Sequence, residues 1–333
     1  MSKQVVAITG ATGFMGRHVL KAVHDAGYRP VAVVRNKITA RDILPDYIEI
    51  RQADMIDLTQ VTDAFRGVQA AIHLAGMVSV NKRDNDAVYR TNVKGAENFL
   101  SAAKDAGVRR ILFTSTTSAV AALTRDQPHF PHDETAGFNL ACEPVAYIQA
   151  KRAAHDRALA ARAEGLPVVT LSPSFVLGPD DINGNTSELI EAVRKKGLPV
   201  CPYGGVNPID VRDIAQAYVA ALQHADPAPH YILASRENVT LKDFIGRVAK
   251  LAGVSPPRIS LPNALTLPIA AVIETIYPAG ALTAAGTRLG SYYWYFDAAL
   301  ARRDLSLNCR PLNETLEATL HWLMDKERAK LKK

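Results

Sequence analysis

The first sixteen residues place the tightest constraint on what this chain can fold into. An apolar, mostly β-branched run over 5–9 is followed by Gly10, Gly13 and Gly16 and then by a helix-compatible segment over 17–26. Gly10 lets the chain turn sharply, Gly13 leaves room for a diphosphate against the backbone, and Gly16 lets the helix lie close to the strand. The positive end of that helix then faces the diphosphate. Because a strand precedes the glycines and a helix follows them, the pattern predicts dinucleotide binding.

Composition limits the class of protein. The 333 residues are 48% apolar and 22% charged, which is typical of a globular protein of one large or two smaller domains. The net charge of +6 is spread along the chain, so we expect the basic C-terminal residues to be a solvated helix end and not a nucleic-acid arm. The three cysteines show no metal-ligand spacing and suit a reducing compartment. We therefore expect a cytoplasmic protein without a metal site.

Two further observations concern membranes. The chain enters a predicted strand at once, so no signal peptide is expected. The apolar stretch 261–282 contains three prolines and a glutamate. Because such breaks are unsuited to a membrane helix, we expect buried helices or a cover over a substrate.

Strand-like runs alternate with helical patterns in the first half of the chain. The alternation predicts an α/β fold, with a doubly wound parallel sheet of the Rossmann type covered on both faces by helices. The predicted strands are 5–9, 30–34, 47–52, 70–74, 110–114 and 167–171, and the main helices are 17–26, 86–106 and 145–163. After residue 177 the alternation loosens. We expect a dinucleotide-binding domain over 1–177, with returning elements near 208–234, and a smaller C-terminal α/β domain over 178–333 that binds mainly the substrate.

The second half contains weaker patterns. They predict helices over 186–196, 211–224, 297–305 and 312–327, and a strand over 231–234. Thr240 begins another helix, with Asp243 three residues later as in a capping box. The aromatic run 291–296 is expected to belong to the core or to line a pocket.

The end of the second predicted strand bears on the choice of cofactor. Arg35 follows the glycine loop by roughly twenty residues, where an acidic side chain would accept from a ribose 2′-hydroxyl and repel a 2′-phosphate. No acidic residue occurs between 26 and 41. Arg35 offers a fork of donors to a 2′-phosphate, so we expect NADP(H) to be preferred over NAD(H). A solvated arginine is the alternative.

Residues after the next two strands are candidates for the adenine side. Asp54 follows the third strand, where its carboxylate can accept from the adenine amino group or, alternatively, cap a helix that begins near Leu58. Small residues at Ala75 and Gly76 leave space for a cofactor to cross the strand ends.

A general acid–base pair is predicted on helix 145–163. Tyr147 and Lys151 are four residues apart and so share one helix face. An ammonium beside a phenol lowers the phenol pKa from its usual value of about 10, which makes it a usable acid for a carbonyl or base for an alcohol. A hydroxyl from Thr116 or Ser115, at the end of the fifth strand, can bond the same oxygen. A packed tyrosine and a surface lysine are the alternative, but the order of glycine loop, hydroxyls and helix favours the acid–base pair.

Six motifs together resemble the extended short-chain dehydrogenase/reductases, the NAD-dependent epimerase/dehydratase superfamily, over nearly the whole chain. They are Thr9-Gly10-x-x-Gly13-x-x-Gly16, His73-Leu74-Ala75-Gly76, Asn92-Val93-x-Gly95, Thr114-Ser115-Thr116, Tyr147-x-x-x-Lys151 and Pro173-Ser174-x-Val176-x-Gly178-Pro179. Softer similarities over 33–35, 204–213 and 231–241 are closest to the dihydroflavonol-4-reductase and 3β-hydroxysteroid dehydrogenase-like branch.

The resemblance implies a reversible carbonyl reduction and assigns the residues. It implies that Tyr147 gives the proton and that Lys151 lowers the tyrosine pKa and holds the nicotinamide ribose. Thr116 would orient the carbonyl, with Ser115 as the fallback. The residues expected to contact the cofactor are Gly10, Thr12, Gly13, Phe14, Met15, Gly16, Arg35, Asp54, Met55, Leu74, Ala75, Gly76, Asn92, Thr114, Tyr147, Lys151, Pro173, Ser174 and Val176.

Three functions fit these patterns to different degrees. The first is NADP(H)-dependent reduction of a ketone, or oxidation of a secondary alcohol, on a fairly apolar small molecule. The second is a nucleotide-sugar epimerase with tightly bound NAD. Such an enzyme usually holds NAD through an acidic residue after the second strand, and this chain has no acidic residue there. The third is a non-catalytic NADP(H)-sensing protein, which the acid–base pair disfavours. We expect the chain to bind a small-molecule ketone or alcohol, and to bind neither nucleic acid nor a membrane. The sequence leaves open whether the protein forms a homodimer.

Overall fold

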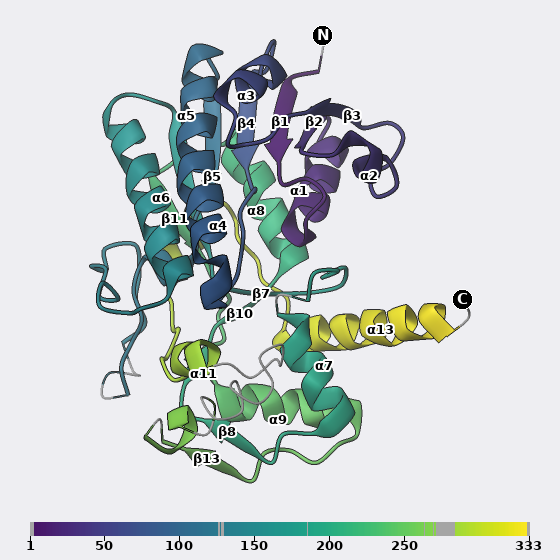
Figure 1. Cartoon of the computed structure of the whole chain (residues 1–333), viewed down its shortest axis with the longest axis vertical. Helices are drawn as coiled ribbons and strands as arrows, with labels where there is room; N and C mark the ends of the chain where they lie inside the picture. The colour runs from purple at the N-terminus through teal and green to yellow at the C-terminus, as the bar shows by residue number, and fades with distance from the viewer. Residues whose placement is uncertain are drawn as a thin grey trace.

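Seven parallel strands form the central sheet of the computed structural model, which describes residues 3–125, 127, 130–184, 186–262, 264–268, 270 and 284–331. The order is β11-β6-β5-β4-β1-β2-β3 (Figure 1). The strands are β1 (Val5–Thr9), β2 (Arg29–Val34), β3 (Glu49–Gln52), β4 (Ala70–His73), β5 (Arg110–Thr114), β6 (Val168–Pro173) and β11 (His230–Leu233). The predicted doubly wound parallel sheet is confirmed. Its strand order reverses between β1 and β4, which is where such sheets bind ligands.

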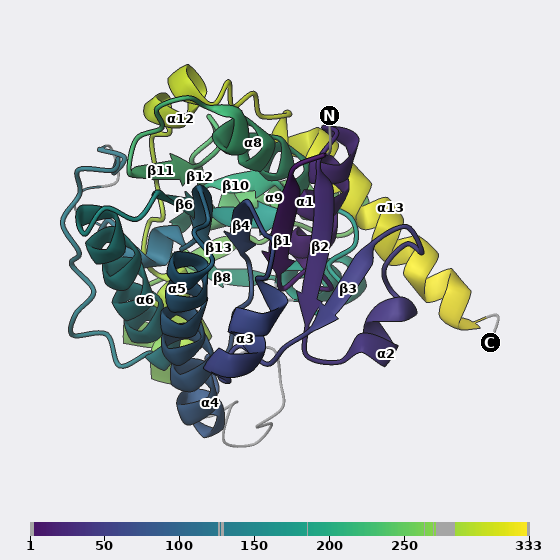
Figure 2. The ribbon, with the colours of Figure 1, turned by 90° about the horizontal axis from the view of Figure 1, so that it is seen from above.

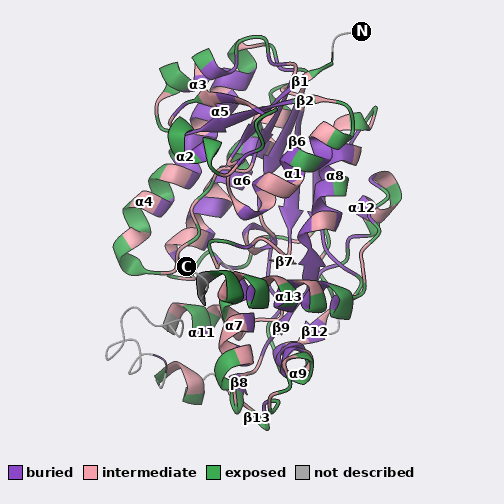
Figure 3. Cartoon of the chain, turned by 90° about the vertical axis from the view of Figure 1, so that its right-hand side faces the viewer, coloured by how far each residue is buried: buried purple, intermediate pink, exposed green. Residues whose placement is uncertain are grey.

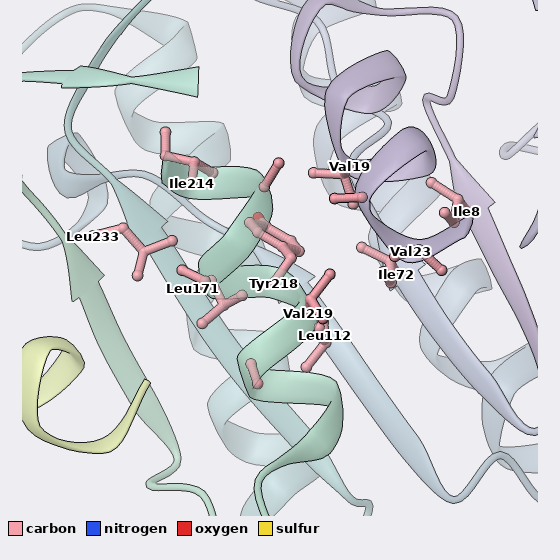
Figure 4. Packing of buried hydrophobic residues seen from close by; sticks show 14 of the residues in the cluster. Ile8, Val19, Val23, Ile72, Leu112, Leu171, Ile214, Tyr218, Val219 and Leu233 are labelled. Atoms are coloured by element: carbon pink, nitrogen blue, oxygen red, sulfur yellow. The ribbon is translucent and has the colours of Figure 1, made fainter. Parts of the chain in front are cut away.

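Helices cover both faces of the sheet (Figure 2). α1 (Phe14–Asp25) and α8 (Val211–Gln223) pack on one face, while α3 (Leu58–Ala64), α5 (Gly95–Asp105) and α6 (Ala146–Ala163) pack on the other. Successive strand residues point to opposite faces, so Val6 and Ile8 join the first core and Ala7 joins the second. Figure 4 shows Ile8, Val19 and Val23 on the α1 side of the first core, with Tyr218 reaching in from α8.

The predicted helix 86–106 is divided by a π-helical turn. It consists of α4 (Asn85–Tyr89), the turn η2 (Arg90–Lys94) and then α5. Asn92 lies within the turn, and its buried amide bonds the main chain of Met77 and Val88. Such turns recur at functional sites.

A further apolar core lies below the sheet in Figure 1. It joins α7 (Ser187–Lys196), α9 (Leu241–Ala252) and α13 (Leu312–Leu331) through residues such as Ile190, Phe244 and Leu316 (Figures 1 and 3). The predicted cap of α9 is present, because Thr240 Oγ1 accepts from the Asp243 amide at 3.1 Å. The prediction of a domain boundary at residue 177 stays a prediction.

Short elements complete the described chain. They are α2 (Lys37–Arg41), η1 (Lys82–Asp84), η3 (Thr117–Ala119), β7 (Phe175–Leu177), β8 (Val200–Pro202), β9 (Gly205–Val206), β10 (Pro208–Asp210), β12 (Val239–Thr240), β13 (Ile259–Leu261), α11 (Ala284–Gly290) and α12 (Ala299–Asp304). Most of the predicted apolar cover over 261–282 lies outside the described residues. Within the described ranges, no helix combines the length and the apolar character that crossing a bilayer requires.

Candidate active site

The glycine loop is shaped by close main-chain approaches. Gly10 has a φ of +67°, and a Cβ there would lie 2.6 Å from the amide nitrogen of Ala75. A Cβ on Gly16 would overlap the carbonyl oxygen of Gly10. α1 begins at Phe14, and no side-chain hydrogen bond caps it at Gly13. The loop therefore presents main-chain N–H groups and a helix N-terminus to an anion, as a bound diphosphate requires.

A cleft of about 690 Å³ opens beside this loop, at the point where the strand order reverses. It contains nine of the residues predicted to bind the cofactor. They are Gly10, Thr12, Gly13, Arg35, Asp54, Met55, Leu74, Ala75 and Gly76. Arg35 is exposed at the cleft wall. The space, the loop and the small residues together fit a dinucleotide.

Asp54 does not have the alternative role of a helix cap. Asp57 caps α3 instead, because its carboxylate accepts from the Gln60 amide at 3.1 Å. Asp54 accepts from the Ile56 amide at 3.1 Å and stays on the cleft wall.

Several predicted cofactor residues do not line this cleft. They are Phe14, Met15, Gly16, Asn92, Thr114, Tyr147, Lys151, Pro173, Ser174 and Val176. Asn92 supports the cleft indirectly, because its side-chain amide makes two hydrogen bonds to the main chain of Met77, which lines the cleft. Ser174 donates to the carbonyl oxygen of Asn207 at 2.8 Å, and Thr114 Oγ1 lies 2.6 Å from Tyr218 Oη.

Other residues of the cleft were not predicted from the sequence. Its remaining lining residues are Val33, Val34, Ala53, Ile56, Met77, Val78, Arg90, Thr91 and Asn183. Asn183 belongs to a loop far along the chain, which α1 holds by bonds from Arg17 to the Asp180 carbonyl and between His18 and the Pro179 carbonyl. The residues around Asn183 give no indication in the sequence that this loop lies at the cleft. The Arg90 and Thr91 positions could have been found from their place beside Asn92.

A buried threonine supports the cleft from beneath. Thr9 Oγ1 accepts from the amides of Leu74 and Ala75, each at 3.2 Å, and lies 2.9 Å from His73 Nδ1. Burial lowers the pKa of His73 to about 3, so its ring is neutral at physiological pH. The pair fixes the end of β4 against β1.

The reacting groups predicted on α6 meet the end of β5. The Tyr147 hydroxyl lies close enough to the Thr116 side chain for Thr116 to lower the phenol pKa, and Lys151 Nζ donates to the Thr114 carbonyl at 2.9 Å. Ser115 Oγ instead lies 2.9 Å from His155 Nδ1. The geometry thus pairs Tyr147 with Thr116, while the fallback hydroxyl of Ser115 is engaged elsewhere.

Burial controls the protonation of the two reacting groups. It raises the pKa of Tyr147 to about 12, against the opposing effect of the Thr116 hydrogen bond. It lowers the pKa of Lys151 to about 8. Burial is the largest influence on the Tyr147 phenol in this geometry, so the lowering of its pKa by Lys151 stays a prediction.

An apolar cluster at the start of α6 includes the Tyr147 ring, and we call it the apolar wall. Its described members other than Tyr147 are Val80, Ala122, Phe138, Leu140, Val145, Ile148, Ala285, Leu289, Tyr292 and Trp294. Trp294 donates its indole N–H to the Leu289 carbonyl at 2.8 Å, and Tyr292 Oη donates to Glu143 at 2.6 Å. The aromatic run 291–296 thus contributes Tyr292 and Trp294 to the cluster that also contains the reacting tyrosine. In the described ranges, no cluster of three or more His, Cys, Asp or Glu side chains is arranged to hold a metal ion.

Comparison with known proteins gives consistent relatives. The profile of the NAD dependent epimerase/dehydratase family matches residues 6–234. The "Putative dihydroflavonol 4-reductase" of Synechocystis sp. is 30% identical over 331 residues, or 96% of this chain and 94% of that protein. Cinnamoyl-CoA reductase 1 of Oryza sativa subsp. japonica is 30% identical over 248 residues, or 69% of this chain and 71% of that protein.

Solved structures show the same fold. The crystal structure of gox2253 superposes with a TM-score of 0.85 at 26% identity, over 98% of this chain and 99% of that one. UDP-glucose 4-epimerase of Thermus thermophilus, solved with NAD, superposes with a TM-score of 0.74 at 21% identity, over 96% and 98% of the two chains.

Proposed function

Because the chain belongs to the NAD dependent epimerase/dehydratase family and is an NAD(P)-dependent oxidoreductase, we propose that it reversibly reduces a ketone on a fairly apolar small molecule with NADP(H). One observation carries this proposal. The Tyr147 phenol lies beside Thr116, one helical turn from the buried Lys151 that bonds the Thr114 carbonyl, at the edge of the sheet that also holds the dinucleotide cleft.

The chain's own groups would hold the cofactor along the cleft. Main-chain N–H groups at the start of α1 would bind the diphosphate, and Asp54 and Met55 would lie against the adenine. Lys151 would hold the nicotinamide ribose. When bound, the nicotinamide supplies the hydride that the carbonyl carbon receives.

Tyr147 would act as the proton donor in the reductive direction. A pKa of about 12 keeps the phenol protonated at neutral pH, so its proton is available to the developing alkoxide. Thr116 would hydrogen-bond the carbonyl oxygen beside Tyr147 and orient it. The Lys151 ammonium would stabilise the tyrosinate left after transfer.

Arg35 supports the preference for NADP(H). Its guanidinium lies at the cleft wall just before α2, where a forked pair of donors can bind a 2′-phosphate. Asn36 caps α2 by accepting from the amides of Ile38 and Thr39, at 2.9 and 3.1 Å. Because Asn36 already binds those amides, the Arg35 guanidinium is the group at this wall that favours an anion.

The apolar wall around Tyr147 supports an apolar substrate. The buried centre of this wall consists of apolar side chains, to which Phe138, Leu289 and Trp294 add further apolar surface. The absence of an acid at 35–37 continues to disfavour the epimerase alternative, which would need tightly held NAD. The three cysteines are free, which suits the cytoplasm that we propose as its location.

The test combines cofactor titration with a ketone panel. We expect NADPH to bind more tightly than NADH, and we expect NADPH oxidation in stoichiometric proportion to alcohol formed for at least one apolar ketone. Tyr147→Phe should bind NADPH normally and lose turnover. Purified protein carrying tightly bound NAD, together with sugar-nucleotide epimerisation, would contradict the proposal in favour of the epimerase. Cofactor binding without turnover on the whole panel would favour the sensing role.

A further inference from the structure

Three consecutive residues at the end of β5 each meet a side chain of α6, two of them through hydrogen bonds and the third, Thr116, through its approach to the Tyr147 hydroxyl. The pairs are Thr114 O with Lys151 Nζ, Ser115 Oγ with His155 Nδ1 and Thr116 with Tyr147. We call this set the β5–α6 clasp. Its three α6 residues are spaced by four, so they lie on one helix face over two turns.

The middle pair of the clasp has no part in the proposed chemistry. Ser115 and His155 are 4% and 3% exposed, and neither lines the cleft. Both are therefore shielded from solvent, and each is the other's hydrogen-bond partner. Their bond nevertheless joins the two elements that carry the reacting groups.

We propose that His155 is a positioning residue for Tyr147 and Lys151, an inference that rests on the proposed function. The Ser115 main chain lies between the residue that binds Lys151 and the residue that binds Tyr147. Any slip of Ser115 along α6 would move both bonds together. A reacting constellation needs placement within about 0.5 Å, and hydrogen bonds from the next layer supply it.

The sequence around the pair is consistent with this role. Arg152, on the same helix, donates to the Ala119 carbonyl at 3.1 Å, so the contact between α6 and the segment after β5 continues beyond the clasp. His155 Nδ1 has one hydroxyl partner in the structure, and Ser115 is that partner. The bond thus sets the depth at which α6 docks on β5.

The chain offers a matched control. His230, on β11, lies 2.8 Å by its Nε2 from Ser172 Oγ on β6, and it is buried like His155. Its ring packs edge-on against His155, with 4.9 Å between the ring centroids. It therefore reproduces the buried histidine–serine bond and the packing, but does not join β5 to α6.

The experiment compares His155→Leu, His155→Asn and His230→Leu with the parent. Asparagine places a polar atom near the position of His Nδ1, so it can keep the bond to Ser115. With a ketone from the panel, we expect His155→Leu to lower kcat at least tenfold with KM within twofold. His155→Asn should recover most of that loss, and His230→Leu should stay within twofold of the parent kcat. Equal losses in His155→Leu and His230→Leu, or no rescue by asparagine, would overturn the proposal.

Two further measurements keep the outcome decisive. If His155→Leu does not fold, Ser115→Ala removes the same bond with little change in volume, and the same tenfold loss of kcat is expected. If no ketone is turned over, the proposed function fails, and the clasp is tested by cofactor binding alone. Lys151→Ala should then weaken dinucleotide affinity several-fold in the parent and much less in the His155→Leu background. An equal loss in both backgrounds would refute the positioning role.

Discussion

The dinucleotide cleft and the β5–α6 clasp differ in what builds them. The cleft is lined mainly by residues at or just after the ends of β1, β2, β3 and β4. The clasp joins two buried elements that are far apart in the chain, since 37 residues separate Thr114 from Lys151 and 40 separate Ser115 from His155. The shape of the cleft thus favours a dinucleotide, whereas burial sets the protonation states of Tyr147 and Lys151 in the clasp.

The largest difference between the cleft and the clasp is expected when a side chain is added in the glycine loop. Gly10→Ala meets the main chain of Ala75 and forces a φ of +67° on a residue with a Cβ. We expect loss of dinucleotide binding and a fall in the free energy of unfolding of several kcal/mol, measured by cofactor titration and urea unfolding. Gly107→Ala is the control, since its φ is +64° but its Cβ meets open space, and it should cost only about 1–2 kcal/mol. Equal costs would show that strain, not crowding, controls the loop.

The next largest effect is expected when the phenol oxygen of Tyr147 is removed from the clasp. Tyr147→Phe keeps the ring in the apolar wall and deletes the proton donor. We expect kcat to fall by roughly 10²–10⁴-fold with the cofactor Kd within twofold, measured by steady-state kinetics and fluorescence titration. The exposed Tyr89 provides the control, because Tyr89→Phe should leave kcat unchanged. A Tyr147→Phe enzyme with parent-like kcat would remove the phenol from the mechanism.

The choice between NADP(H) and NAD(H) tests the cleft through one side chain, Arg35, at its wall. Arg35→Ala should weaken NADP(H) binding by about 10–100-fold, in line with about 1.5–3 kcal/mol for hydrogen bonds to a charged group. Its NAD(H) affinity should change little, because NAD has no 2′-phosphate. Arg41→Ala is the control, since that guanidinium bonds the Ile48 carbonyl. A parallel loss of both cofactors would place Arg35 elsewhere than at the 2′-phosphate.

The smallest effect expected is a pH dependence of the clasp. Lys151 has a pKa near 8, so it is charged below pH 8 and loses its charge as the pH rises above that value. The kcat for ketone reduction should be level from about pH 6 to 7.5 and then fall, by at most about tenfold per pH unit. Lys151→Arg should move the fall to higher pH. A level profile to about pH 10 would show that the ammonium charge is not needed.

The sequence was most informative where the structure depends on neighbouring residues. The order of the strands in the chain, the helix 145–163 and nine residues of the cleft followed from apolar runs, glycine spacing and short motifs. Asn183 could not follow, because a loop reached through Arg17 and His18 brings it to the cleft. The division of the helix at Asn92 depends on a bond to the Met77 main chain, which periodicity does not report.

The amino-acid sequence by itself determined the βαβ unit, the kinds of reacting group and the family resemblance, since these depend on local conformation and on residue identity. Only the tertiary structure decided that Thr116 and not Ser115 meets Tyr147, that His155 binds Ser115, and that burial raises the pKa of Tyr147. The physical reason is that hydrogen-bond partners and desolvation depend on which distant segments enclose a group. Those segments are set by packing and not by the residues beside it.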